Sequence, residues 1–259
     1  DVYSPFTYSD DLVLGDNTVL SPGLAKASIE LSRAAYGQDR VVRMLSILGF
    51  DAEAYQYDLI ESMPLSDCHK AAVGVGTKTL TRDGEEVLLY SLAFKGTGGS
   101  LEWISNFILG SPEDTEHYGF SQAAGEIAPF LRSLLDEDGY DADHTLLWIT
   151  GHSRGAAVAD IMTDRLRDQG TIFAYTFACP RTTTETGLIP GSFTFNIDGD
   201  VVPTIPLAIW GFTHYASREI ILPSPEGAVR HGKSFTDLLE ILFPTRESAY
   251  THLARAVLL

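Results

Sequence analysis

A serine between two glycines is the residue most suited to chemistry, in the run Gly151-His152-Ser153-Arg154-Gly155. The G-x-S-x-G pattern is typical of nucleophilic serines, but alone it arises by chance in roughly one such chain in seven. Its context favours the nucleophile, because the strand-like run 146–150 precedes it and the small residues 156–159 begin a predicted helix. A tight turn between a strand and a helix is what a nucleophile elbow needs. The alternative is a serine that caps an ordinary helix.

A nucleophilic serine also needs groups that stabilise the oxyanion of the intermediate. The residue after the nucleophile, Arg154, would supply one backbone N–H at the positive end of the predicted helix. The second donor should come from a loop after an earlier strand. The loop Lys95-Gly96-Thr97 follows an apolar run that ends at Phe94, so Thr97 is the candidate.

The acid and the base of such a site should follow the serine in that order along the chain. Asp198 and Asp200 both follow the predicted strand 193–197, and either could be the acid on position alone. The downstream histidines are His214, His231 and His252, and order alone gives each a similar claim. The pattern therefore predicts a Ser-Asp-His triad whose base is left open.

The elements expected to position these residues alternate between strands and helices. A Ser21-Pro22 helix start, a second helix ending near Leu48 and an Asp83-Gly84 hairpin turn come first. The expected helices span 22–35, a stretch ending near 48, 120–135, 154–168, 234–243 and 249–259, and the expected strands span 71–79, 86–94, 146–150, 172–178, 193–197 and 220–222. This order predicts a mostly parallel sheet with helices on both faces, and a single domain over 1–259 with helices in 1–50.

The composition of the chain disfavours several classes of binding partner. The chain has 259 residues and a net charge of −17, which disfavours binding to nucleic acids and anionic membranes. No run is long enough for a transmembrane segment. Whether Cys68 and Cys179 form a disulfide is left open. The start at Asp1 without Met fits a processed, secreted enzyme and equally a chain trimmed at its start, so a cytoplasmic location stays open.

Several segments in a fixed order resemble the class 3 lipase family, the fungal-lipase-like branch of the α/β hydrolases, as a bacterial-type member. The resemblance covers roughly 85–220. The matching segments are Phe94-Lys95-Gly96-Thr97, Glu102-Trp103-Ile104-Ser105-Asn106-Phe107, His117-Tyr118-Gly119-Phe120, the serine motif, Thr176-Phe177-Ala178-Cys179-Pro180-Arg181, and Asn196 followed by Asp200-Val201-Val202-Pro203. The resemblance implies an α/β-hydrolase fold with a helical lid.

The same resemblance implies which of the open candidates act. It makes Asp200 the acid, although three residues separate it from Asn196 where fungal members usually have two. His214 matches a family histidine that is not the base. The family's base lies some fifty residues after the acid, a spacing that His252 fits. Lys95 replaces the usual arginine and keeps its charge.

The resemblance also implies the reaction and its substrates. Ser153 would form an acyl-enzyme, with His252 as base, Asp200 as acid and the N–H groups of Thr97 and Arg154 as the oxyanion hole, with no metal and no cofactor. A candidate lid over about 98–112 carries Trp103, Ile104, Phe107 and Ile108, unless this helix packs permanently on the core. We expect a lipase that cleaves acylglycerols, with lipid or another hydrophobic ester as partner and transient contact with a lipid interface. The alternatives are a phospholipase A1, a feruloyl-type esterase or a non-catalytic binding protein.

Overall fold

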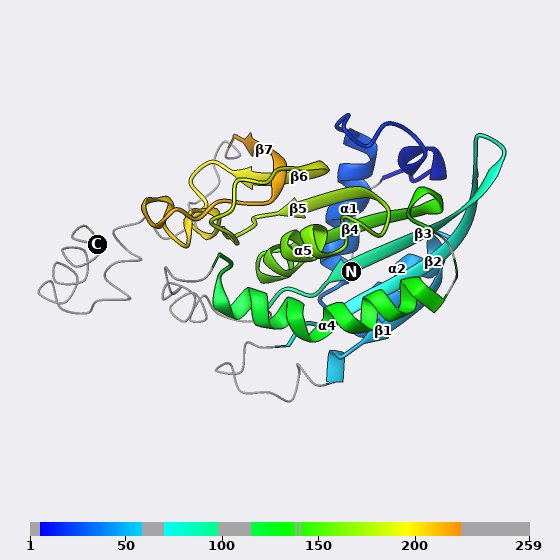
Figure 1. Cartoon of the computed structure of the whole chain (residues 1–259), viewed down its shortest axis with the longest axis horizontal. Coiled ribbons are helices and arrows are strands. Elements are labelled where there is room, and N and C mark those ends of the chain that lie inside the picture. Colours follow the sequence, from blue (N-terminus) through cyan, green and yellow to red (C-terminus); the bar gives the residue numbers. More distant parts are fainter. Residues whose placement is uncertain (1–5, 59–69, 98–114, 138, 140, 224–259) are drawn as a thin grey trace, which may run out of the picture.

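One central β-sheet organises the molecule (Figure 1). The computed structural model describes residues 6–58, 70–97, 115–137, 139 and 141–223. These residues form a seven-stranded sheet in the spatial order β1-β2-β3-β4-β5-β6-β7. The strands are β1 Asp51–Tyr55, β2 Val73–Arg82, β3 Glu85–Phe94, β4 Thr145–His152, β5 Thr171–Phe177, β6 Ile189–Ile197 and β7 Ala216–Leu222.

The sheet is antiparallel at its start and parallel afterwards. β1, β2 and β3 pair antiparallel, whereas β3 to β7 pair parallel. Asp83 and Gly84 join β2 to β3 with φ angles of 54° and 91°, which matches the left-handed two-residue turn expected for this dipeptide. Because β3 to β7 run parallel, their carboxyl ends share one edge of the sheet. The loops after β3, β4 and β6 therefore meet there.

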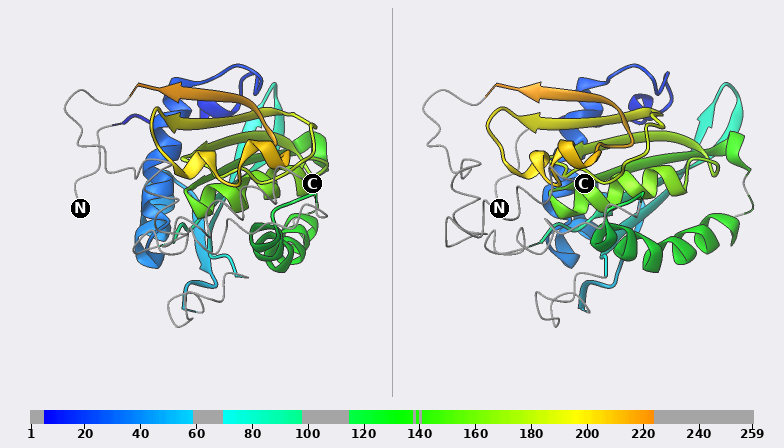
Figure 2. Two further views of the ribbon diagram at one scale, coloured as in Figure 1. Left: turned by 90° about the vertical axis from the view of Figure 1, so that its left-hand side faces the viewer. Right: turned by 60° about the vertical axis from the view of Figure 1, so that its left-hand side comes forward.

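Helices cover both faces of the sheet, as the sequence predicted (Figure 2). The α-helices are α1 Pro22–Ala34, α2 Gln38–Ile47, α4 Tyr118–Glu137 and α5 Arg154–Arg165. Short 3₁₀ helices span Asp10–Val13, Ala142–His144, Val202–Thr204 and Ala208–Trp210. The helices α1 and α2 lie on one face, and α4 and α5 lie on the other.

Each face has its own hydrophobic core. On the α4–α5 face, Phe120, Ile127 and Ile161 pack against strand residues such as Leu92 and Ile149. On the α1–α2 face, Leu31 and Leu45 pack around Trp148, whose indole N–H donates to Ser28 Oγ at 2.8 Å. Strand β4 contributes side chains to both cores, because successive side chains of a strand point to opposite faces of the sheet. The strand that leads to Ser153 is therefore buried from Thr145 to Gly151.

The predicted elements agree with the structure within a few residues, apart from one strand. The sequence analysis missed β1, an edge strand in which none of the residues is fully buried. The predicted helices 234–243 and 249–259 and the candidate lid lie outside the described residues. Within the described part, none of the helices combines the length and apolar character needed to cross a lipid bilayer.

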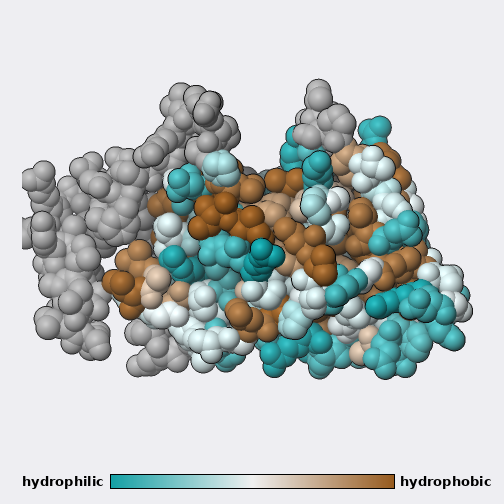
Figure 3. Space-filling view, turned by 90° about the horizontal axis from the view of Figure 1, so that it is seen from above, coloured by the Kyte–Doolittle hydropathy of each residue, from teal (hydrophilic) through white to brown (hydrophobic). Residues whose placement is uncertain are grey.

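The face seen from above carries hydrophobic side chains in several groups among polar ones (Figure 3).

Candidate active site

Ser153 lies in a strained turn between β4 and α5. Its φ and ψ are 57° and −126°, a conformation that side chains rarely adopt. Its backbone N–H donates to the carbonyl oxygen of Phe177 at 2.9 Å, and its own carbonyl accepts from Ala156 at 2.9 Å. These bonds hold the strained backbone from both sides. Such strain, where the surroundings impose it, is common at functional sites.

The two glycines of the motif are required by close backbone contacts. A Cβ on Gly151 would overlap the carbonyl oxygen of Gly155, and a Cβ on Gly155 would overlap the carbonyl oxygen of Phe94. The start of α5 is therefore packed directly against the end of β3 and of β4. The tight turn that the sequence predicted has this geometric cause.

The loop after β3 lies beside the turn, as expected for an oxyanion loop. A Cβ on Gly155 would come within 2.9 Å of the backbone nitrogen of Gly96. Gly96 itself is closed in by the Tyr36 hydroxyl and by the carbonyl oxygen of His152, which would lie 2.8 Å from an added Cβ. Thr97 is half-buried directly after it. The structure thus brings the Thr97 loop to the first turn of α5, where Arg154 N–H lies.

The side chains of Lys95 and Arg154 are buried although both are basic. Arg154 is 5% exposed, and its guanidinium donates to the carbonyl oxygen of Lys70 at 2.6 Å. Lys95 is 7% exposed, and its ammonium lies 5.1 Å from the centre of the Tyr57 ring. A cation over an aromatic ring is stabilised by the ring quadrupole. Both side chains therefore anchor the backbone segments that carry the candidate oxyanion donors.

Asp200 and Asp198 differ in their surroundings, which favours the first as the acid. Asp200 is half-buried, and its Oδ1 accepts from Val202 N–H at 3.0 Å. Burial lowers the pKa of His152, and the charge of Asp200 partly offsets that lowering. Asp198 is exposed, and its backbone N–H donates to Leu222 O at 2.8 Å. Of the two, only Asp200 interacts electrostatically with His152, the residue before Ser153, among the described residues.

A tyrosine that the sequence analysis missed contacts this site. Tyr36 OH lies 2.7 Å from His152 Nδ1, in a hydrogen bond between residues 116 positions apart. Burial lowers the pKa of His152 and raises the pKa of Tyr36 to about 12. Both groups are therefore neutral at pH 7. The pair connects the end of α1 to the elbow and closes over Gly96.

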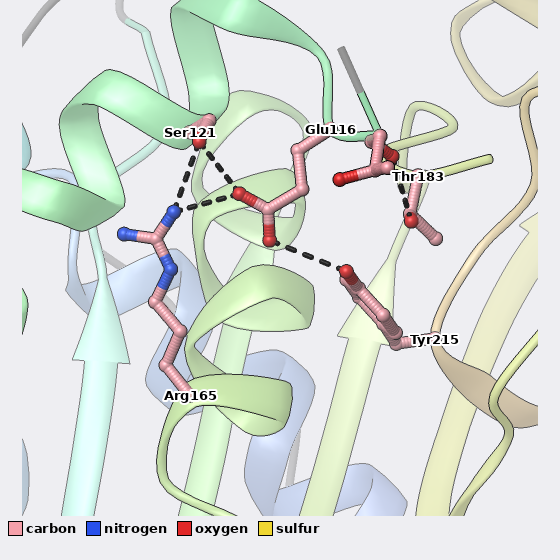
Figure 4. Close-up of polar contacts among 6 residues, drawn as sticks. Glu116, Ser121, Arg165, Thr183 and Tyr215 are labelled. Atoms are coloured by element: carbon pink, nitrogen blue, oxygen red, sulfur yellow. Dashed lines mark hydrogen bonds and ion pairs between the residues drawn. The ribbon is translucent and has the colours of Figure 1, made fainter. Parts of the chain in front are cut away.

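A polar network fixes the segment that leads into α4 (Figure 4). Glu116 Oε2 accepts from Arg165 at 2.7 Å and from Ser121 Oγ at 2.6 Å, and Glu116 Oε1 accepts from Tyr215 OH at 3.3 Å. Thr183 Oγ1 donates to Thr115 O at 2.9 Å. The network joins residues 115–121 to α5 and to the loop before β7. It was not predicted, because its members are far apart in the sequence.

The remaining predicted residues fall into two groups. His252, His231 and the lid residues Trp103, Ile104, Phe107 and Ile108 lie outside the described residues. His214 is described and is buried in a cluster with Asp160 and Cys179. Cys179 is a free, buried thiol, and Cys68 lies outside the described residues.

Comparisons with known proteins identify the same central segment. Residues 91–210 match the family model described as Lipase (class 3). The secreted mono- and diacylglycerol lipase 1 of Fusarium solani is 27% identical over 158 residues, which covers 54% of this chain and 46% of that protein. The chain thus spans about half the length of the curated relative it matches. This relative is fungal, and the bacterial-type assignment stays a prediction.

Solved structures support the fold. The Rhizomucor miehei lipase in complex with its propeptide superposes with a TM-score of 0.50 at 18% identity, covering 84% of this chain and 69% of that one. A triacylglycerol lipase described as having a serine protease triad at its catalytic centre gives a TM-score of 0.51 at 19% identity, covering 77% and 80%. The chain has the α/β-hydrolase-type fold of these proteins, with a mostly parallel central sheet, as the sequence predicted.

Proposed function

We propose that the chain is a serine carboxylic-ester hydrolase of the class 3 lipase family that acts on acylglycerols, because residues 91–210 match the model of that family. One observation carries the proposal. Ser153 occupies a strained turn at the start of α5, with the Gly96–Thr97 loop packed against the same turn. This packing supports a nucleophile at Ser153 with oxyanion N–H donors from the two adjoining segments, at the carboxyl edge of the sheet.

The proposed reaction proceeds through an acyl-enzyme. Ser153 Oγ attacks the ester carbonyl while His252 accepts its proton, and the N–H groups of Thr97 and Arg154 stabilise the oxyanion. Collapse of the intermediate releases the alcohol, which takes the proton from His252. Water, deprotonated by the same histidine, then attacks the acyl-enzyme, and His252 returns the proton to Ser153 Oγ as the acid leaves. Asp200 orients the imidazole and stabilises its charged form.

The electrostatics of the described residues support this arrangement. Oxyanion stabilisation by two preorganised N–H donors contributes a large share of such rate enhancements, with about 3 kcal/mol for one donor. The buried side chains of Arg154 and Lys95 hold the two donor segments in place. The half-buried Asp200 interacts electrostatically with His152, which directly precedes the serine. The extracellular location of the Fusarium relative supports secretion of this chain as well.

The assay is hydrolysis of p-nitrophenyl esters of increasing acyl length. We expect activity that rises beyond the acetyl ester and falls at least about 10³-fold in Ser153→Ala, because the residual rate comes from binding and the oxyanion hole alone. Ser133→Ala is the matched control, since Ser133 lies on the exposed side of α4. Unchanged activity in Ser153→Ala would exclude the nucleophile, and an inactive wild-type protein would favour the binding-protein alternative.

Natural substrates separate the remaining alternatives. We expect faster hydrolysis of mono-, di- or triacylglycerols than of phosphatidylcholine or of feruloyl esters. Preference for the phospholipid would replace the proposal by phospholipase A1 activity, and preference for the feruloyl ester by a feruloyl esterase. Substituting His214, His231 and His252 one at a time identifies the base. We expect only His252→Ala to lose activity at the level of Ser153→Ala.

A further inference from the structure

Three side chains with metal-binding atoms meet behind the elbow. Asp160 is in α5, Cys179 follows β5 and His214 precedes β7. One ligand atom from each lies within 4.8 Å of those of the other two. Their exposed fractions are 2%, 0% and 7%. A carboxylate, a thiol and an imidazole are therefore gathered inside the protein, away from the proposed reaction.

Hydrogen bonds hold the Asp160 carboxylate and the backbone of Cys179, whereas one ring nitrogen of His214 has no hydrogen-bond partner among the described residues. Asp160 Oδ2 accepts from Tyr215 N–H at 3.1 Å and from the Thr182 hydroxyl. Cys179 N–H donates to Asn196 Oδ1 at 3.3 Å, which fixes the backbone under the thiol. His214 Nδ1 is buried and has no hydrogen-bond partner among the described residues. Hydrogen bonds to a ligating carboxylate are typical of metal sites, whereas an unpartnered buried nitrogen costs free energy.

The charges of the three side chains suit a divalent cation. One carboxylate, one thiolate and one neutral imidazole together balance a charge of two. The cluster with its ion would then be neutral as a whole.

We propose that Asp160, Cys179 and His214 bind a single zinc ion. Zinc accepts sulfur, nitrogen and oxygen ligands in tetrahedral geometry, whereas magnesium and calcium avoid thiolates. The three side chains leave one position of a tetrahedron for a fourth ligand. On binding, Cys179 loses its thiol proton to solvent and His214 coordinates as the neutral imidazole. Because all three side chains are buried, we assign the ion a structural role and none in ester hydrolysis.

The position of the site suggests what the ion stabilises. Asp160 lies two turns along α5 from Ser153. Cys179 lies two residues after Phe177, whose carbonyl accepts the Ser153 N–H. His214 adjoins Tyr215, which contacts both Asp160 and Glu116. A bound ion would join α5, the β5–β6 connection and the segment before β7, which together surround the elbow.

The test begins with the wild-type chain, so that no variant has to fold. The protein is incubated with zinc, dialysed, and analysed for metal by mass spectrometry. We expect about one zinc ion per chain, and a lower melting temperature after removal by a chelator that zinc then restores. Replacement by cobalt should give a near-ultraviolet thiolate-to-cobalt absorption band. A folded, active wild-type protein that retains no zinc and shows no such band would overturn the proposal and leave Asp160 and His214 as a metal-free pair.

Variants assign the ligands. We expect Cys179→Ser to lose the thiolate-to-cobalt band, and His214→Gln to bind zinc at least about 100-fold more weakly, since loss of an outer partner alone costs 10- to 100-fold. His144→Gln is the control, because His144 is exposed and pairs with Asp141 at 2.6 Å before β4. A folded His214→Gln protein with wild-type zinc affinity would contradict the assignment.

Discussion

The two ends of the parallel strands differ in how their connecting segments are built. At the amino end, Gly84 faces open space in a regular turn, and His144 and Asp141 form an exposed pair. At the carboxyl end, Ser153 and Ala178 have φ angles of 57° and 47°, and both motif glycines touch backbone atoms. The turn at Ser153 thus combines a positive φ with close backbone packing, whereas the hairpin turn at Asp83 and Gly84 has positive φ angles in open space. Close backbone contacts also occur at the amino end, at Gly170 and Gly191, so the difference lies between these two turns.

The largest effect that would test this difference is on catalysis. Asp200→Asn should lower kcat by about 10⁴-fold, because a neutral amide neither orients the base nor stabilises its charged form. Asp198→Asn, in the same loop, should change kcat less than about threefold, since exposed surface positions matter little. Steady-state kinetics on one long-chain ester measures both. The reverse order of effects would make Asp198 the acid.

The next effect is on stability, through the glycines at the two ends. Gly155→Ala should lower the free energy of unfolding by about 3 kcal/mol, because the new Cβ overlaps the carbonyl oxygen of Phe94. Gly84→Ala should cost about 1 kcal/mol, since only its φ of 91° opposes the change. Urea unfolding followed by circular dichroism compares the two. Equal losses would show that the elbow is no more tightly packed than the hairpin.

The smallest predicted effect is the pH dependence of stability. Burial lowers the pKa of His152 below its unfolded value, so its contribution is present above about pH 6.5 and is lost as the pH falls. His152 can change the free energy of unfolding by at most about 1.4 kcal/mol per pH unit, and His152→Asn should remove this part of the pH dependence. Asp141 raises the pKa of His144. The small contribution of His144 to folding stability is therefore present at low pH and is lost as the pH rises.

Unfolding in urea between pH 7.5 and 5.5 measures both histidines. His144→Gln should leave the steeper loss on acidification in place, because His144 is exposed and its pair is screened by solvent. A His152→Asn protein that loses stability on acidification as steeply as the wild type would contradict the buried, neutral state of His152.

Local patterns were sufficient to predict much of this molecule. The Asp83-Gly84 turn, the Ser21-Pro22 helix start and the strand–serine–helix motif all involve neighbouring residues, and the structure confirms each. The edge strand β1 was missed although its first four residues alternate between exposed and half-buried, because Asp, Glu and Ala are uncommon in strands.

Long-range contacts could not be predicted in this way. Tyr36 reaches His152 across 116 residues, and Glu116 reaches Tyr215 across 99. The cluster of Asp160, Cys179 and His214 comes from three segments whose proximity depends on the order of strands in the sheet. The sequence gives each residue type, whereas the pairing of distant segments follows from the assembled sheet.

Covalent labelling tests the central claim, that Ser153 is the nucleophile, most directly. The protein would be treated with a fluorophosphonate ester, digested, and mapped by mass spectrometry while esterase activity is followed. The account predicts one adduct, on Ser153, and loss of activity in proportion to labelling. Complete inactivation with the adduct on another residue, or full activity with Ser153 labelled, would contradict it.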